Sequence, residues 1–149
     1  MKRRIAAVLL VMFLAAAGCA VSGADAQEDA EQPYLGQVSE EDPSIGYVLV
    51  ENRNQYGLLP LPAEGEYTKT IRQELADGSE YVNVIHVTPT GFWMEKSNCE
   101  GQDCIDEGEV TLENRQERIL GNMVICLPHQ LMLYLITREE AVSFLSQGR

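Results

Sequence analysis

From residue 46 onward, apolar and polar positions alternate in short runs that are separated by turn-forming residues. Such runs, rich in valine, isoleucine and aromatic residues, are typical of β-strands. Strands are expected over residues 46–51, 56–62, 67–75, 81–87 and 92–96. Pro60 and Pro62 cannot donate hydrogen bonds to a ladder, so the second strand is expected at a sheet edge. A turn at Thr88–Gly91 predicts a hairpin between the fourth and fifth strands.

Two further expected strands, residues 123–127 and 131–136, are continuously apolar and do not alternate. A strand that is apolar on both faces is covered on both faces. Thr137 and Glu140 have the spacing of a helix capping box. An apolar stripe at helical spacing follows, and a glycine ends it: Ala141, Phe144, Leu145 and Gly148. We therefore expect a short C-terminal helix that packs on the sheet.

The segment between the two groups of strands, residues 112–121, is polar. It carries two acids and two bases: Glu113, Arg115, Glu117 and Arg118. We expect a loop or an irregular hairpin whose charges are solvated and form weak ion pairs.

The N-terminal residues predict export from the cytoplasm. Three basic residues, Lys2 to Arg4, precede an unbroken apolar run over residues 5–17. This order is typical of an export signal. The residues up to Cys19 resemble a lipobox, in which cleavage leaves Cys19 as the lipidated N-terminus, although lipoprotein signals usually have leucine where Ala16 stands. We favour lipidation of Cys19; cleavage after Ala26 and an uncleaved anchor stay open. Each alternative places the remaining chain on the outer side of a bacterial cell membrane.

The charge distribution separates a tether from a domain. The chain carries a net charge of −12, and seven acids without a lysine or arginine fall in residues 25–42. Such a run is expected to be solvated and disordered. We therefore divide the chain into a signal or anchor (residues 1–21), an acidic tether (22–44) and one domain (45–149). The domain is acidic as well, which argues against binding to nucleic acid, because that binding requires neutralised phosphates.

The cysteine-containing segments resemble a known family. Four residues separate Cys99 from Cys104, Gly108 follows, and an apolar strand ends in Ile125-Cys126-Leu127-Pro128. This order is similar to the NusG domain II-like family. Family members often have Cys-Pro-Asp at the first cysteine, where this chain has Cys99-Glu100-Gly101. The resemblance implies an all-β fold, a small antiparallel β-sandwich or barrel, in agreement with the strand pattern. The export signal favours a stand-alone exported member over a domain of a transcription factor.

Three cysteines follow Cys19, and their chemistry has two principal interpretations. Neighbouring cysteines in an exported domain usually pair, and we favour a disulfide between Cys99 and Cys104. Cys126 would then be a buried free thiol, and a Cys104–Cys126 disulfide is the rival pairing. Alternatively, Cys99, Cys104, Cys126 and His129 supply the three thiolates and one imidazole of a structural zinc site. The simpler interpretation of His129 is a structural one, in which it shapes the turn before the last strand.

Enzymatic chemistry is not indicated by the sequence. Reactive dithiols usually have two intervening residues and positive surroundings. Here four residues intervene, and Glu100 and Asp103 lie among them, so a thiol–disulfide enzyme is the weakest hypothesis. We expect a non-catalytic, membrane-tethered module that has no cofactor. Its expected role is to bind a protein of the cell envelope. A metal-binding domain is the alternative.

Overall fold

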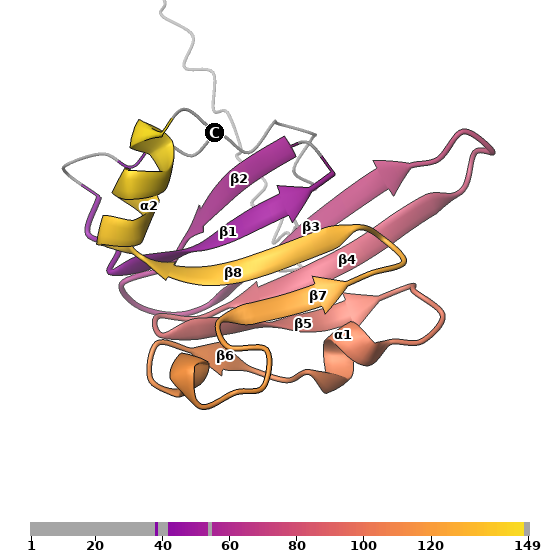
Figure 1. The fold of residues 1–149 in the computed structure, drawn as a ribbon. Coiled ribbons are helices and arrows are strands. Elements are labelled where there is room, and N and C mark those ends of the chain that lie inside the picture. The colour runs from indigo at the N-terminus through magenta and orange to yellow at the C-terminus, as the bar shows by residue number, and fades with distance from the viewer. Residues whose placement is uncertain (1–37, 39–41, 54, 148–149) are drawn as a thin grey trace, which may run out of the picture. The chain divides into compact units, whose positions relative to one another are not determined.

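The computed structural model describes residues 38, 42–53 and 55–147, and these form two four-stranded antiparallel sheets (Figure 1). The first sheet has the strand order β2-β1-β8-β7. Its strands are β1 (Gly46–Asn52), β2 (Gln55–Pro60), β7 (Met123–Cys126) and β8 (Leu131–Thr137). The second sheet has the order β3-β4-β5-β6. Its strands are β3 (Tyr67–Glu74), β4 (Glu80–Val87), β5 (Gly91–Ser97) and β6 (Val110–Thr111).

The predicted all-β sandwich is confirmed, and β2 lies at a sheet edge as its prolines required. Three short helical segments complete the domain: α1 (Asp103–Asp106), the 3₁₀ turn η1 (Asn114–Gln116) and α2 (Arg138–Ser146). The sequence pattern did not predict β6 or α1. Both are too short to show a period, since β6 has two residues and α1 has four.

One apolar core is shared by the inner faces of the two sheets. Val48 and Leu133 of the first sheet and Ile85 and Phe92 of the second are all fully buried in the same cluster. Successive strand residues point to opposite faces. Phe92 therefore lies in the core, while its neighbour Trp93 faces outward and stacks on His86.

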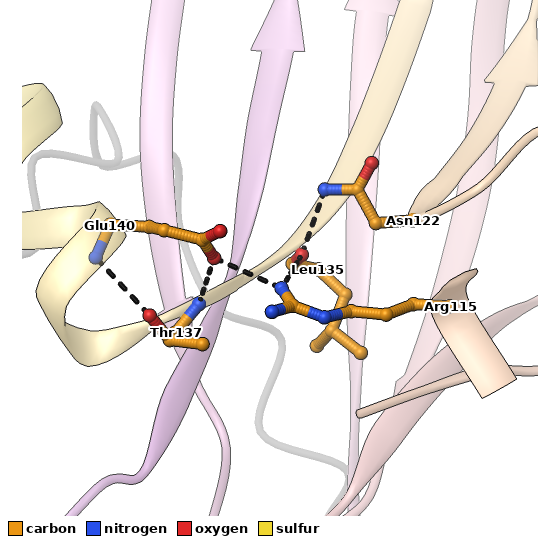
Figure 2. Close-up of polar contacts among 5 residues, drawn as sticks. All are labelled: Arg115, Asn122, Leu135, Thr137 and Glu140. Atoms are coloured by element: carbon orange, nitrogen blue, oxygen red, sulfur yellow. Dashed lines mark hydrogen bonds and ion pairs between the residues drawn. The ribbon is translucent and has the colours of Figure 1, made fainter. Parts of the chain in front are cut away.

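Helix α2 covers part of the outer face of the first sheet, as the two apolar strands predicted. Ala141 is fully buried there, and Phe144 packs against Tyr56 with ring centroids 5.6 Å apart. The predicted capping box is present, because Thr137 and Glu140 each bond the other's backbone N–H (Figure 2). Leu145 was expected in the apolar stripe but is exposed, because the helix contacts the sheet mainly through Ala141 and Phe144. The predicted stop at Gly148 lies outside the described residues.

The polar segment before β7 is more firmly held than its composition suggested. Arg115 donates to the Glu140 carboxylate at 3.0 Å and to the carbonyl oxygen of Leu135 at 3.4 Å (Figure 2). The Asn122 amide donates to the same carbonyl at 2.9 Å. The last residue of β8 that pairs with β7 is Tyr134. The carbonyl oxygen of Leu135 therefore accepts hydrogen bonds from these side chains and not from a strand. Arg115 therefore joins η1 to β8 and to the start of α2.

We expect Arg115→Ala to lower the free energy of unfolding by about 1.5–3 kcal/mol, the range for hydrogen bonds to charged groups. The Arg115 side chain is only 18% exposed, so water replaces its contacts poorly. Arg72→Ala is the matched control, because Arg72 pairs with Glu80 at the surface and is 62% exposed. Its loss should cost less than about 1 kcal/mol. Urea unfolding of both variants measures the difference, and equal losses would contradict a structural role for Arg115.

Several predictions concern residues outside the described part of the chain. These are the signal or anchor over residues 1–21, the lipidation of Cys19 and most of the tether over residues 22–44. Among the described residues, no helix is long and apolar enough to cross a membrane.

Candidate functional site: a cluster of three buried thiols

Three cysteines from separate segments meet within the shared apolar core. Cys99 follows β5, Cys104 belongs to α1 and Cys126 ends β7, so the cluster joins an edge strand of one sheet to the other sheet. Within the described part of the chain, this is the one set of three potential metal ligands that converges, with all Sγ atoms within 4.8 Å of one another. The Sγ atoms of Cys99 and Cys104 lie 3.7 Å apart. All three side chains are buried.

The short helix α1 brings Cys104 to the other two cysteines. Gln102 precedes the helix in a left-handed conformation (φ 56°), and its amide donates to the carbonyl oxygen of Ser97 at 3.2 Å. Gly108 leaves the helix with a φ of 71°, which glycine adopts without strain. The Glu107 carboxylate accepts a hydrogen bond from the Ile125 N–H at 3.0 Å. This last bond ties the end of α1 to β7, the strand that carries Cys126.

The thiols have unequal electrostatic surroundings. Burial, and then the neighbouring Cys126, raise the pKa of Cys104 to about 12. Burial also acts to raise the pKa of Cys99, but hydrogen bonds, with that of Ser97 the strongest, outweigh it and lower the pKa. Cys99 therefore becomes a thiolate more readily than Cys104.

The structure brings Cys99, Cys104 and Cys126 together and leaves His129 outside their cluster. The His129 ring is buried in the corner between β7 and β8, where Nδ1 lies 2.7 Å from Asn83 Oδ1. Its face stacks on Tyr81 with centroids 4.2 Å apart. Burial lowers the pKa of His129. The imidazole therefore shapes the corner, and a site in which it binds the same ion as the three thiolates does not match this arrangement.

The disulfide interpretation stays a prediction. A disulfide requires Sγ atoms about 2.05 Å apart, and the 3.7 Å between Cys99 and Cys104 is a non-bonded contact. Cys126 lies close enough to both that the rival Cys104–Cys126 pairing stays open as well.

A buried polar chain beside the cluster was not predicted. The side chain of Asn83 is fully buried; its Nδ2 donates to Ser97 Oγ at 3.0 Å, and its Oδ1 faces His129. Ser97 Oγ in turn lies 3.8 Å from Cys126 Sγ. One signal was available in the sequence. Asn83 lies two and four residues before the core residues Ile85 and Val87, so its side chain faces the core as theirs do. A buried amide requires hydrogen-bond partners.

A second polar group lies on the outer face of the second sheet, away from the core. His86 stacks on Trp93 with ring centroids 3.9 Å apart, and its Nδ1 contacts Glu95 Oε2 at 2.9 Å. Its Nε2 lies 3.3 Å from a carboxylate oxygen of Glu66, in a charge contact without hydrogen-bond geometry. Burial acts to lower the pKa of His86, but the bond to Glu95 and the two negative charges outweigh it and raise the pKa.

The raised pKa of His86 predicts a pH-dependent contribution to stability. Protonation favours the folded state, so this contribution is complete below about pH 6.5, the usual pKa of unfolded histidine. It is lost as the pH rises through the higher pKa of the folded state. We expect Glu95→Gln to destabilise the domain more at pH 6 than at pH 8.5 in urea unfolding. Glu64→Gln, at an exposed position, controls for net charge. A Glu95→Gln effect that is constant with pH would contradict the prediction.

Comparisons with known proteins agree with this architecture. The model of the NusG domain II family matches residues 5–139. A Listeria innocua protein of known structure is 17% identical; the match covers 63% of this chain and 98% of that one, with a TM-score of 0.50. A DUF1312 family protein from Enterococcus faecalis V583 is 19% identical over 62% of this chain and 97% of its own, with a TM-score of 0.47.

The Listeria innocua protein is similar in fold, and an identity of 17% supports nothing further. A search of curated proteins finds no match. The family model, in contrast, spans most of the chain, from the apolar N-terminal run to the second residue of α2. This chain therefore belongs to the NusG domain II family.

Proposed function

We propose that this protein is a non-catalytic exported module that binds a thiophilic metal ion at Cys99, Cys104 and Cys126. The proposal rests on one observation, the convergence of three buried Sγ atoms from three elements. A disulfide uses two sulfur atoms and leaves the third as a buried free thiol that packs in the core. A metal ion engages all three at once.

The distances suit a metal–thiolate centre. Zinc–sulfur bonds are about 2.3 Å long, and the edge of a tetrahedron with such bonds is about 3.8 Å. The 3.7 Å between Cys99 and Cys104 is close to this value. Cys126 needs only a small inward shift, because no pair of Sγ atoms is more than 4.8 Å apart. The cluster would then fasten β7 to the end of β5.

The donor set also restricts the kind of ion. Thiolate sulfur favours soft ions, of which Cu(I) and Zn(II) are the common ones in proteins. With His129 held by Asn83, the described residues offer three ligands at this site. Cu(I) is satisfied by few soft ligands, whereas tetrahedral Zn(II) would take a fourth ligand from outside the cluster. Cu(I) is therefore the ion that the three thiolates match best.

The cellular setting is proposed on the sequence alone. The basic and apolar N-terminus supports export and attachment to the bacterial cell membrane, with Cys19 as the favoured lipidation site. The acidic tether would let the domain reach a protein of the envelope. Thiol-based metal binding is compatible with this location only if the metal protects the cysteines from oxidation.

Mass spectrometry of the full chain tests the proposal. The chain is purified in mild detergent without chelators or reductants and is alkylated under native and denaturing conditions. We expect one metal ion in the native mass, lost on denaturation, with Cys99, Cys104 and Cys126 then alkylated. One disulfide, one alkylatable thiol among these three and no metal would overturn the proposal and support the disulfide. Anaerobic titrations of the reduced chain with Cu(I) and with Zn(II) then identify the ion.

A further inference from the structure

We infer that Ser97 is a positioning residue for the thiol cluster, held in place by a buried hydrogen-bond chain through Asn83 and His129. This inference rests on the proposed metal site and deepens it. None of the three residues is a ligand in the arrangement described above. Their role is to fix where the sulfur of Cys126 points.

The hydrogen-bond chain is continuous from the corner between β7 and β8 to the thiol cluster. His129 Nδ1 lies 2.7 Å from Asn83 Oδ1, and Asn83 Nδ2 lies 3.0 Å from Ser97 Oγ. Ser97 Oγ lies 3.8 Å from Cys126 Sγ. Asn83 and His129 are 0% and 1% exposed, so water does not compete for these bonds. The far end is also anchored, since the Gln73 amide donates to the carbonyl oxygen of His129 at 3.0 Å.

The direction of each hydrogen bond follows from counting donors and acceptors. Ser97 Oγ accepts from Asn83 Nδ2 and from the backbone N–H of Cys99, at 3.2 Å, so both of its lone pairs are occupied. Its own hydrogen is left for the sulfur atoms of the cluster; Cys126 Sγ lies 3.8 Å away, and the Cys99 sulfur is a hydrogen-bond partner as well. Because Asn83 uses its N–H group toward Ser97, its Oδ1 accepts from His129 Nδ1–H. The network thus assigns a hydroxyl donor to the thiol cluster and a proton to Nδ1 of His129.

This direction is the one that a metal–thiolate centre needs. A thiolate that binds a metal carries negative charge, and a hydroxyl that donates to it stabilises this charge and fixes its side-chain rotamer. Ser97 also holds the backbone of Cys99, so a single hydroxyl aligns two of the three proposed ligands. Loss of such outer-shell partners typically weakens metal binding 10–100-fold.

The same hydrogen-bond chain explains why His129 lies near Cys126 in the sequence without joining the thiol cluster. Its Nδ1–H is committed to Asn83, and its ring is fixed between that bond and the Tyr81 face. His129 therefore supports Asn83, which supports Ser97. In this arrangement the histidine acts on the metal through two intervening side chains.

Titrations of the full chain with Cu(I) and with Zn(II) test the inference. They compare the unmodified chain with Ser97→Ala, Ser97→Thr and a control variant, Ser146→Ala. Ser146 is exposed on α2, and its hydroxyl donates to the Ser143 carbonyl oxygen. We expect Ser97→Ala to bind one ion with about 10–100-fold lower affinity. Ser97→Thr keeps the hydroxyl and should restore the affinity, and Ser146→Ala should match the unmodified chain. With Co(II) as a spectroscopic probe, the sulfur charge-transfer bands should shift in Ser97→Ala and return in Ser97→Thr.

The outcomes separate this inference from the proposed function. If the unmodified chain binds metal and Ser97→Ala binds it equally well, the positioning role is overturned and the metal site stands. If the unmodified chain binds neither ion, the proposed function is overturned. The positioning role is then decided by the alkylation rate of Cys126 in the reduced, metal-free protein. A several-fold change in Ser97→Ala that Ser97→Thr reverses would support it, and equal rates in all three proteins would refute it.

Discussion

Replacing any one of Cys99, Cys104 or Cys126 with serine is expected to weaken metal binding more than about 100-fold, whereas His129→Gln should keep one bound ion. A serine hydroxyl is a hard, poorly ionised ligand and cannot replace a thiolate on a soft ion. Outer-shell losses already cost about 10–100-fold, and loss of a ligand should cost more. His129 lies outside the cluster, so its replacement should act only through Asn83 and produce a smaller decrease.

Competition titrations with Cu(I) and Zn(II) measure these affinities in the reduced chain. Because each cysteine is buried, a serine variant could lose the ion simply by unfolding. Circular dichroism of the metal-free variants, together with alanine replacements at the same three positions, separates loss of a ligand from loss of the fold. If His129→Gln abolished binding as completely as the cysteine variants, His129 would be a direct ligand and the three-thiolate site would be wrong.

Gly91→Ala is expected to destabilise the domain by about 3 kcal/mol, at or above the upper end of the usual cost of overpacking. Gly91 pairs with Thr111 where β5 meets β6. A Cβ atom at this position would lie 2.1 Å from the carbonyl oxygen of Val110 and 2.9 Å from the Cα atom of Thr111. Both obstacles are backbone atoms, which cannot rotate away, so the β5–β6 pair must separate and expose the buried Val110.

Gly101→Ala is the matched control for this prediction. The nearest atom to its added Cβ is a carboxylate oxygen of the exposed Asp103 side chain, at 3.2 Å, and that side chain can move. Its effect should stay within about 0.5 kcal/mol, as for most surface substitutions. The single tryptophan, Trp93, lies two residues from Gly91 and reports urea unfolding by fluorescence. Equal stabilities of the two variants would show that β6 moves freely and that the close approach is unimportant.

The strands and the covering helix were predictable because their determinants are local. The runs of strand-forming residues located β4 and β5 and the hairpin between them, and the capping box placed the start of α2. The proline-containing strand was correctly expected at an edge, since the missing N–H is a property of the residue itself. The family resemblance, carried by the cysteine spacing, was confirmed by a match over residues 5–139.

Features that depend on long-range neighbours were missed or misjudged. Arg115 was expected to be solvated, but it bonds Glu140 and Leu135, which lie 20 or more residues away in the chain. The two residues of β6 have no periodicity and become a strand only because β5 lies beside them. Ser97 and Asn83 have ordinary residue types for a strand, and only their contacts with Cys126 and His129 reveal a role.

In the candidate site, some neighbours follow from spacing along the sequence and others depend on the three-dimensional arrangement. The sequence alone places Cys99 and Cys104 together, because four intervening residues and a turn allow no large separation. It equally places His129 beside Cys126, yet the folded chain turns the imidazole toward Asn83 and the sulfur toward the other cysteines. Which side chains meet depends on α1, which packs against β5 of the second sheet and against β7 of the first. That packing arises from burial of apolar surface shared by the whole domain, and no single segment encodes it.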